Sequence, residues 1–542
     1  MTSDRARRAP ARLLAALVLG ALAACTATPA GPASPPAAPG PSASPVDRQP
    51  EGRGWVAAEN ERPGTPGWEA AEATYAADRE LAGYFGQVSV EPGEPATLYA
   101  TSRVGDFDVI AYRLGWYSGA GAREVWRSPV PVTGVEQGPP LMAADRTITT
   151  DWRPSATLPT VGWPEGSYLV ELSAQAGRKT RYVPLTVRSR SSAGRLVLMS
   201  AVLSYQAYNA WGGYSLYLGP DGRFRSRSAR VSFDRPYDRN GAMEVFKWEV
   251  PVVQHAERLG LDLAYTTTWD VAQRPGTLDD ARGVVSEGHD EYWPVSLRDA
   301  VEAARDAGAN LAFLGANALY WRVRLEEGPL GPGRTMVGFK DSGQDPVQGP
   351  ETTTRWRSRP WPRPENSLTG MLYECYPARG ALRVEEGDFF LFRGTGAATG
   401  DEFPGLLGDE IDRAYPIAGT PPSLEVVAHS KVRCEDVGWT YADMTYYTTA
   451  SGAGVFATGT MMWVNALASR TAGTGLTPAS VSFARGVTDN LLRAMAAGPM
   501  GIEHPARPNL AALEASPSTA HGSAGEVDRP DTATPGPRSA PV

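Results

Sequence analysis

Short strand-like runs that alternate with helical segments constrain the fold of this chain more than any other feature of its sequence. Strands are predicted at residues 195–200, 261–265, 283–286 and 310–314, and helices at residues 252–259 and 296–307. The first run is almost continuously apolar, which is typical of a strand buried on both faces of a parallel sheet. Strands and helices that alternate at this spacing predict a doubly wound α/β domain.

The α/β domain is expected to cover residues 191–503. Apolar stretches at residues 388–392 and 454–458 predict further strands, and a final helix at residues 479–495 is expected to pack back on the sheet. The sequence shows no internal repeat.

Residues 66–190 have a different pattern of short strands separated by turns. The strands are predicted at residues 97–101, 108–112, 168–172 and 181–187. Gly/Pro turns separate them, for example at residues 91–94 and 164–167. This pattern predicts an immunoglobulin-like β-sandwich, so we expect a β domain followed by an α/β domain.

The first 24 residues have the pattern of a signal peptide. Basic residues precede an apolar run at residues 13–22 that is too short to span a bilayer. The run ends in Leu22-Ala23-Ala24-Cys25, which resembles the lipobox of bacterial lipoproteins. We expect cleavage before Cys25 and a lipid on its thiol, which would anchor the chain to the extracytoplasmic face of the cell membrane. An ordinary secretory peptide with a chance cysteine is the alternative.

The stretch after Cys25 is almost entirely Pro, Ala, Ser, Gly and Thr as far as about residue 50. Such a composition cannot bury a core. We predict a linker over residues 25–65 that holds the folded part off the membrane, and a disordered tail of similar character over residues 504–542.

Charge and cysteine content exclude several functions. Without residues 1–24, which hold four arginines and one aspartate, the chain has 48 basic and 59 acidic residues. This acidity argues against nucleic acid as a partner. Apart from Cys25, the chain has only Cys375 and Cys434, for which we predict a disulfide in an oxidising compartment, with two buried thiols as the alternative. Two cysteines and five scattered histidines do not suit a zinc-finger-type site.

Three polar clusters follow predicted strands, at residues 204–213, 287–293 and 315–318. In open α/β sheets, ligands bind at the carboxyl ends of the strands, so the fold is expected to bring these clusters together. In the second cluster, His289, Asp290 and Glu291 crowd one acid–base group against two carboxylates, which suits proton transfer or metal binding. A capped helix start is the alternative explanation of these acids.

The third cluster is a tight turn that resembles the nucleophile elbow of glutamine-amidotransferase-like folds. A cysteine nucleophile would stand in that turn, but the chain has Ala316 and Asn317 there. A thiol-dependent amidase is therefore not expected. Ser204 and Ser286 lie outside any Gly-x-Ser-x-Gly turn, which also disfavours a serine hydrolase.

These clusters together resemble the large (beta) subunit family of N,N-dimethylformamidase. The matching stretches are residues 112–117, 205–213, 232–237, 286–293, 313–321, 405–413 and 452–463. The similarity extends over roughly residues 84–500 and thus includes both predicted domains.

The resemblance implies an amidohydrolase with a single iron ion held by two tyrosinates and a glutamate. Glu291 matches the glutamate ligand. Tyr205 is our choice for the first tyrosine, with Tyr208 as its competitor, and Tyr237 is our choice for the second. Three anionic oxygens suit a hard cation.

Three other residues are expected to act beside the iron. His289 and Asn317 match polar residues next to the metal in the family, and Glu410 is expected to add a further acid. His289 or Glu410 would move the proton, while Asn317 would stabilise the developing oxyanion.

The leading hypothesis is therefore a surface-anchored iron-dependent hydrolase of the C–N bond of a small amide. A lipid anchor is a departure from the family enzyme, which is a cytoplasmic-type complex with a small partner subunit. The alternative is a non-catalytic lipoprotein that binds a glycan or cell-wall ligand on the same fold. The sequence leaves open a homo-oligomer, the substrate, and any need for a small subunit.

Overall fold

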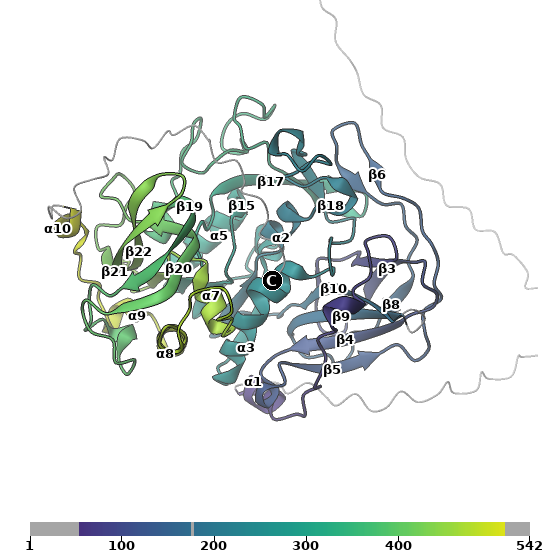
Figure 1. Cartoon of the computed structure of the whole chain (residues 1–542), viewed down its shortest axis with the longest axis horizontal. Helices are drawn as coiled ribbons and strands as arrows, with labels where there is room; N and C mark the ends of the chain where they lie inside the picture. Colours follow the sequence, from purple (N-terminus) through teal and green to yellow (C-terminus); the bar gives the residue numbers. More distant parts are fainter. Residues whose placement is uncertain (1–53, 175–177, 515–542) are drawn as a thin grey trace, which may run out of the picture. The chain divides into compact units, whose positions relative to one another are not determined.

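The computed structural model describes residues 54–174 and 178–514. Over these residues the fold is mixed α/β, with many strands and few helices (Figure 1). The predicted signal peptide at residues 1–24, the lipidation of Cys25, the linker up to residue 53 and the tail beyond residue 514 lie outside the described residues. Within the described ranges, no helix has the length and apolar character needed to cross a membrane.

Two sheets form the N-terminal part of the fold. The smaller has the strand order β1-β3-β8 and the larger the order β2-β10-β9-β4-β5. Their strands are β1 (Leu81–Phe85), β2 (Ser89–Val90), β3 (Ala96–Ser102), β4 (Asp108–Leu114), β5 (Ala122–Arg127), β8 (Ala156–Leu158), β9 (Gly166–Ala174) and β10 (Lys179–Val187). A separate ribbon pairs β6 (Leu141–Met142) with β7 (Ile148–Thr149).

The larger of these sheets is buried on both faces. Val109 and Ala111 of β4 pack between the two N-terminal sheets. The alternate residues Ile110 and Tyr112 join a second hydrophobic cluster, which also contains Leu198 of the α/β part. Because successive side chains of a strand point to opposite faces, one sheet here contributes to two cores.

A mixed sheet of nine strands is the centre of the α/β part. Its order is β13-β11-β14-β16-β23-β22-β21-β19-β20, parallel from β13 to β23 and antiparallel from there on. The strands are β11 (Leu196–Ser200), β13 (Leu263–Thr267), β14 (Gly283–Ser286), β16 (Asn310–Phe313), β19 (Leu372–Arg383), β20 (Glu402–Arg413), β21 (Glu425–Cys434), β22 (Gly438–Thr448) and β23 (Gly454–Ala457).

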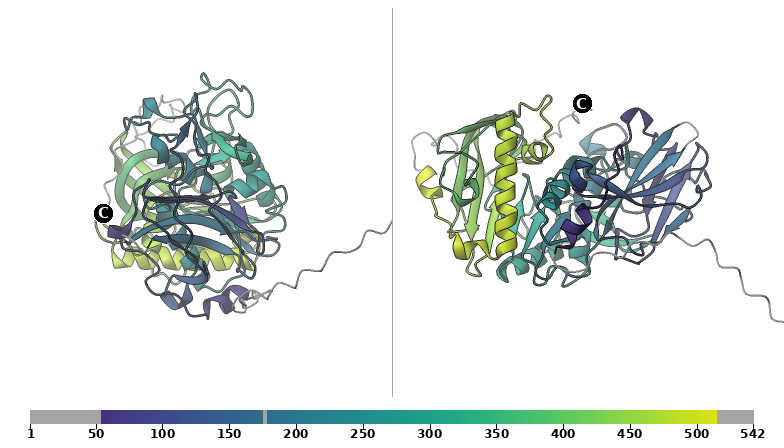
Figure 2. Two further views of the ribbon diagram at one scale, coloured as in Figure 1. Left: turned by 90° about the vertical axis from the view of Figure 1, so that its right-hand side faces the viewer. Right: turned by 90° about the horizontal axis from the view of Figure 1, so that it is seen from below.

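Helices cover both faces of this sheet. Leu198 packs with α3 (Val250–Arg258), α7 (Met462–Leu467) and α8 (Pro478–Ala497) on one face. Val197 packs with α4 (Thr268–Gln273) and α5 (Val295–Asp306) on the other. Figure 2 shows the long yellow helix α8 lying along the green strands. Burial of both faces explains why the strands are apolar without alternation.

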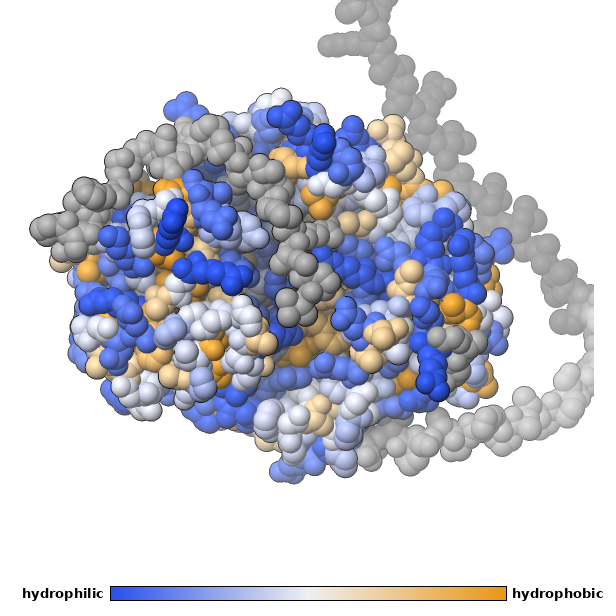
Figure 3. Space-filling view, in the orientation of Figure 1, coloured by the Kyte–Doolittle hydropathy of each residue, from blue (hydrophilic) through white to orange (hydrophobic). Residues whose placement is uncertain are grey.

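Smaller elements complete the fold. A four-stranded sheet has the order β12-β18-β17-β15, formed by β12 (Arg230–Ser232), β15 (Tyr292–Pro294), β17 (Trp321–Gly328) and β18 (Gly331–Val337). The remaining helices and helical turns are α1 (Trp55–Asn60), η1 (Glu72–Thr74), η2 (Tyr117–Gly119), α2 (Val202–Tyr208), η3 (Trp211–Gly213), η4 (Phe224–Ser226), η5 (Val245–Glu249), α6 (Asn366–Thr369), η6 (Phe390–Phe392), α9 (Met500–Glu503) and α10 (Leu510–Glu514). On the face shown in Figure 3, hydrophobic residues are scattered among hydrophilic ones, as is usual for a protein surface.

The structure differs from the sequence-based expectation at three places. In the range predicted as a disordered tail, residues 510–514 form α10 and Leu510 is buried in the core. Residues 388–392 do not form the predicted strand, because Phe390–Phe392 is a 3-10 turn whose neighbour Phe389 packs against Tyr446 of β22. The range predicted as linker contains α1, where Trp55 and Val56 are buried in the core. Aromatic side chains thus anchor residues 388–392 and α1 without a strand.

Candidate active site

Three loops that follow parallel strands meet at one end of the nine-stranded sheet. They carry α2 after β11, residues 287–291 after β14, and residues 314–320 after β16. Gly288 has a φ of 72°, and a Cβ on Gly315 would lie 2.2 Å from the Gly288 carbonyl oxygen. The two glycines therefore let the loops that carry His289 and Asn317 touch backbone to backbone.

Glu291 is the centre of the site. Its carboxylate accepts a hydrogen bond from the Tyr208 hydroxyl at 2.7 Å on Oε2 and from the Tyr217 hydroxyl at 2.6 Å on Oε1. The two phenol rings stack with their centroids 4.4 Å apart. The backbone N–H of Glu291 donates to Ser204 Oγ, which fixes the residue to α2. Glu291 is only 1% exposed, so three oxygen-bearing side chains converge in a buried position.

His289 lies between two carboxylates. Its Nε2 is 3.4 Å from Glu291 Oε2 and 3.7 Å from Glu410 Oε2. Burial alone would lower the pKa of His289, but the hydrogen bond to Glu291 and the charge of Glu410 outweigh burial and raise it. Burial would raise the pKa of Glu291, whereas His289 and Lys340 hold it below its ordinary value.

Glu410 and Asn317 complete this side of the site. Burial raises the pKa of Glu410 to about 7, although His289 and a hydrogen bond from Asn317 act in the opposite direction. Glu410 Oε2 and Asn317 Oδ1 are buried and make no hydrogen bond to any described residue. Asn317 has a φ of 59°, and its backbone N–H donates to Asp412 Oδ1 at 2.8 Å. The turn after β16 thus has a left-handed conformation at Asn317, which asparagine tolerates, and places this side chain beside Glu410.

A buried lysine, Lys340, lies beside the tyrosine rings of the site. Lys340 Nζ lies 3.3 Å from the centroid of the Tyr217 ring and 5.0 Å from that of Tyr292. Lys340 is buried, and its charge favours the anionic form of Glu291.

Two of the tyrosines chosen from the sequence lie elsewhere. Tyr205 and Tyr237 line a neighbouring cavity with Glu249, and neither hydroxyl bonds to Glu291. Tyr208, the competitor of Tyr205, makes that bond instead. The structure therefore brings together Glu291, His289, Asn317 and Glu410. The tyrosines beside Glu291 are Tyr208 and Tyr217, not Tyr205 and Tyr237.

Tyr217 lies outside the first polar cluster, which ends at residue 213, and is therefore not among the residues predicted from the sequence. Its signal is a second aromatic residue after the glycine pair, in Gly212-Gly213-Tyr214-Ser215-Leu216-Tyr217. The backbone N–H of Tyr217 donates to Ser215 Oγ, which turns the chain back toward Tyr208. Across residues 54–174 and 178–514, no group of three His, Cys, Asp or Glu side chains is arranged to hold a metal ion. The oxygen set at Glu291 depends on phenols, which lie outside those residue types.

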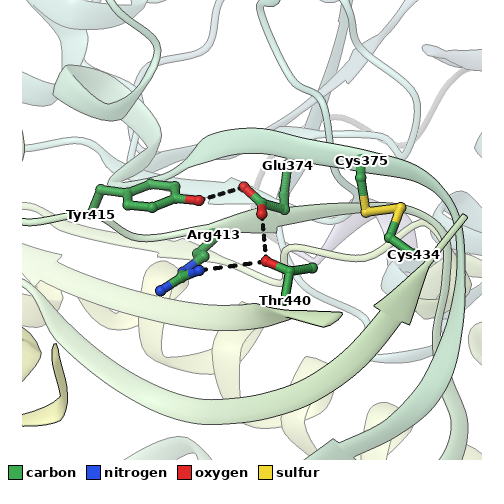
Figure 4. Close-up of a disulfide and its surroundings, with 6 residues drawn as sticks. All are labelled: Glu374, Cys375, Arg413, Tyr415, Cys434 and Thr440. Atoms are coloured by element: carbon green, nitrogen blue, oxygen red, sulfur yellow. Dashed lines mark hydrogen bonds between the residues drawn. A yellow bond between two sulfur atoms is a disulfide. The ribbon is translucent and has the colours of Figure 1, made fainter. Parts of the chain in front are cut away.

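A disulfide joins two of the antiparallel strands of the same sheet. Cys375 of β19 and Cys434 of β21 are bonded, with their Cα atoms 6.4 Å apart. Figure 4 shows the disulfide beside Glu374, which accepts hydrogen bonds from Tyr415 at 2.6 Å and from Thr440. Of these two strands, β19 pairs with β20, which carries Glu410. The disulfide thus links strands on the Glu410 side of the sheet.

A family comparison agrees with the placement of the site. The model of the family described as "N,N-dimethylformamidase beta subunit-like, C-terminal" matches residues 108–475, more than half of the chain. The chain belongs to this family. The match includes Tyr208, Tyr217, Glu291 and Glu410, so the whole oxygen cluster lies in the part that the dimethylformamidase-like family shares.

Two further comparisons add little. No curated protein matches the chain. One matching solved structure is a cycloisomaltooligosaccharide glucanotransferase of Paenibacillus sp. in complex with cycloisomaltoheptaose. It is 10% identical over 68% of each chain, with a TM-score of 0.17, a value too low to support any conclusion about fold or function.

Proposed function

We propose that this dimethylformamidase-like chain hydrolyses the C–N bond of a small amide with the help of one iron ion. The main observation behind the proposal is the buried Glu291 carboxylate, which accepts hydrogen bonds from two tyrosine hydroxyls. His289 lies next to Glu291, and Glu410 lies next to His289. Membership of a family named for an amide-cleaving enzyme supports an amide as substrate. We further propose that lipid on Cys25 tethers the chain to the extracytoplasmic face of the cell membrane.

The donor set fits a hard cation. Tyr208, Tyr217 and Glu291 would hold the iron, and all three offer oxygen ligands. Burial and the charge of Glu291 raise the pKa of both phenols well above the ordinary value, so they stay protonated without a cation beside them. A trivalent ion would favour the phenolates instead, and when bound it would supply Lewis acidity toward an amide carbonyl.

The protein's own groups would move the protons. Amide hydrolysis requires a base that accepts a proton from the attacking water and an acid that delivers one to the leaving amine. His289 Nε2 faces both Glu291 and Glu410, so it would accept the proton and share it with Glu410. The amide of Asn317 would donate a hydrogen bond to the oxygen that gains negative charge.

We also propose a specific fold type for each of the two parts of the chain. The two N-terminal sheets enclose a common core, which supports an immunoglobulin-like sandwich. The parallel strands β13, β11, β14, β16 and β23 with helices on both faces support a doubly wound, glutamine-amidotransferase-like domain.

The experiment is an amide screen on iron-loaded protein covering residues 46–542. Release of free amine from formamides, acetamides and larger linear amides would be measured for the wild type and for His289→Ala. We expect turnover of at least one amide, and a loss of about 10²–10⁴-fold in kcat for His289→Ala. Tyr84→Phe is the matched control and should keep full activity, because its hydroxyl bonds to Thr150 at 2.8 Å and not to Glu291.

Absence of turnover for every amide would contradict the proposal. The chain would then be a binding lipoprotein for a glycan or cell-wall ligand on the fold of the family. Turnover that survives in His289→Ala would retain the amidase but refute the role of His289.

A further inference from the structure

A second cavity lies beside the candidate active site. It has a volume of about 50 Å³, which is room for a few water-sized groups. The N-terminal sheets contribute Tyr84 to its wall, and the α/β part contributes Tyr205 and Glu249. Neither Glu291 nor His289 lines it. The cavity is therefore a separate compartment next to the oxygen cluster.

Three buried hydrogen-bond donors line this cavity without a hydrogen bond of good geometry to any described residue, although the Tyr205 hydroxyl lies close enough to Glu249 to oppose the rise that burial causes in the pKa of that acid. They are the Tyr205 hydroxyl, Gln206 Nε2 and Arg235 Nε. Buried donors are nearly always paired in folded proteins, so three in one cavity point to a guest that carries acceptor atoms.

The charges around the cavity favour an anionic guest. Arg235 is 1% exposed, and its other nitrogens bond to backbone carbonyls and to Gln206 Oε1. Within the described part of the chain, no carboxylate forms an ion pair with Arg235, whereas Arg334 in the same wall pairs with Asp234 at 2.7 Å. Glu249 accepts a hydrogen bond from Ser200 Oγ at 2.5 Å, and burial raises its pKa, which favours the uncharged acid. Asp238 acts on Arg235 through its charge, but Arg235 has no carboxylate in an ion pair with it in this part of the chain.

We propose that this cavity binds a small carboxylate of the size of formate or acetate. Two oxygens in one plane match the Nε–H of Arg235 and the amide of Gln206, and the Tyr205 hydroxyl donates a third hydrogen bond. Binding of a carboxylate in this cavity does not depend on the proposed function. The identity of the natural ligand rests on that function: if the chain hydrolyses amides, the ligand is the acid product of the reaction, held next to the site that releases it.

The test is calorimetric titration of iron-free protein, residues 46–542, with sodium formate, against sodium chloride at equal ionic strength. We expect saturable formate binding that chloride does not reproduce. Tyr205→Phe, which removes only the hydroxyl, should weaken binding by about tenfold or more, since a hydrogen bond to a charged group is lost. Tyr84→Phe is the matched control: its hydroxyl is on the same wall but is already bonded to Thr150 at 2.8 Å, so affinity should not change.

The variant Glu291→Gln shows whether formate binds in the cavity or at the oxygen cluster around Glu291. Formate affinity that persists in this variant supports the cavity, whereas its loss would place formate at the oxygen cluster and overturn the proposal. Equal affinity in Tyr205→Phe and wild type, or no binding beyond that of chloride, would also overturn it. A chain that binds formate here but hydrolyses no amide would refute the proposed function and leave the cavity site supported.

Discussion

At the level of single residues, His289 and Glu410 are the two groups that we propose share one proton. The His289 side chain is buried and the Glu410 side chain is 16% exposed, and His289 Nε2 lies 3.7 Å from Glu410 Oε2. The pKa of Glu410 is raised to about 7, so the carboxyl can hold or give up a proton near neutral pH. Its Oε2 atom is buried and makes no hydrogen bond to any described residue, and perturbed acids of this kind cluster at functional sites.

Glu410→Gln keeps the size of the side chain and removes its ability to exchange the proton. We expect kcat for amide hydrolysis to fall by about 10²–10⁴-fold while the melting temperature stays close to that of the wild type. Glu72→Gln, at an exposed position, is the control and should change neither quantity. Wild-type kcat in Glu410→Gln would show that Glu410 is not part of the proton path.

The sequence could predict the polar half of the site but not its phenols. Glu291, His289, Asn317 and Glu410 follow or lie on strands whose ends meet, which the alternation of strands and helices already implies. Tyr205 and Tyr208 are three positions apart on one helix, so their side chains point in directions that differ by only about 60°. The choice between them depends on the rotation of α2 about its axis, and packing sets that rotation rather than local sequence.

At the scale of elements, the disulfide ties β19 to β21. It closes a loop with a sequence separation of 59 residues. The loss of chain entropy in the unfolded state predicts that Cys375→Ala with Cys434→Ala lowers the free energy of unfolding by about 4 kcal/mol. Urea denaturation of the double variant, beside wild type under oxidising conditions, measures this. A change below about 1 kcal/mol would show that the loop is restrained without the disulfide.

A buried ion pair in the hairpin of β21 and β22 makes a pH-dependent contribution to the stability of the fold. His429 Nδ1 lies 2.7 Å from Asp443 Oδ1. Burial would lower the pKa of His429, but Asp443 outweighs burial and raises it. A histidine with a raised pKa stabilises the fold below its unfolded-state pKa, and this contribution is lost as pH rises through the folded-state value.

His429→Gln should therefore lower the free energy of unfolding by more at low pH than at high pH. We expect a destabilisation that is larger by about 1 kcal/mol at about pH 5.5 than at about pH 8.5. Urea denaturation at both values tests this, and Asp443→Asn should follow the same trend because it removes the partner. A difference between His429→Gln and wild type that is independent of pH would contradict the assignment.

Element types were predictable where a periodic pattern was long enough. The helix predicted at residues 479–495 corresponds to α8, Pro478–Ala497, since its apolar spacing persists over several turns. The run around Phe389 is only a few residues long, and a buried turn needs as many apolar residues as a strand does. Length and periodicity could not separate these two structures.

At the scale of the whole molecule, a buried ion pair joins the N-terminal sheets to the α/β part. Arg113 of β4 and Glu257 of α3 have fully buried side chains, with Arg113 Nη1 3.0 Å from Glu257 Oε2. Tyr265 also donates a hydrogen bond to Glu257. The two parts share one hydrophobic cluster as well, so we expect them to unfold together.

Glu257→Ala should destabilise the chain by about 3–5 kcal/mol, because it leaves the Arg113 cation buried without its partner. Scanning calorimetry should show one transition for the wild type and a lower melting temperature for the variant. Glu136→Ala, which breaks an exposed pair with Arg103, is the control and should cost less than about 1 kcal/mol. Two separate transitions in the wild type would mean that the parts are independent domains.

This joint core could not be predicted from the sequence. The sequence predicts a strand at residues 108–112 but not which surface covers Ile110 and Tyr112, which are buried in the core shared with the α/β part. Which surface covers a sheet depends on residues distant in the sequence, and local periodicity holds no information about them.

The decisive experiment measures the iron content and visible absorption of protein covering residues 46–542, purified without chelator. We expect near one iron per chain and an absorption band from tyrosinate bound to iron. The band and the iron should be lost or strongly reduced in Tyr217→Phe and Glu291→Ala but retained in Tyr205→Phe. Absence of iron after anaerobic reconstitution, or a band that follows Tyr205 instead of Tyr217, would contradict the proposed iron site.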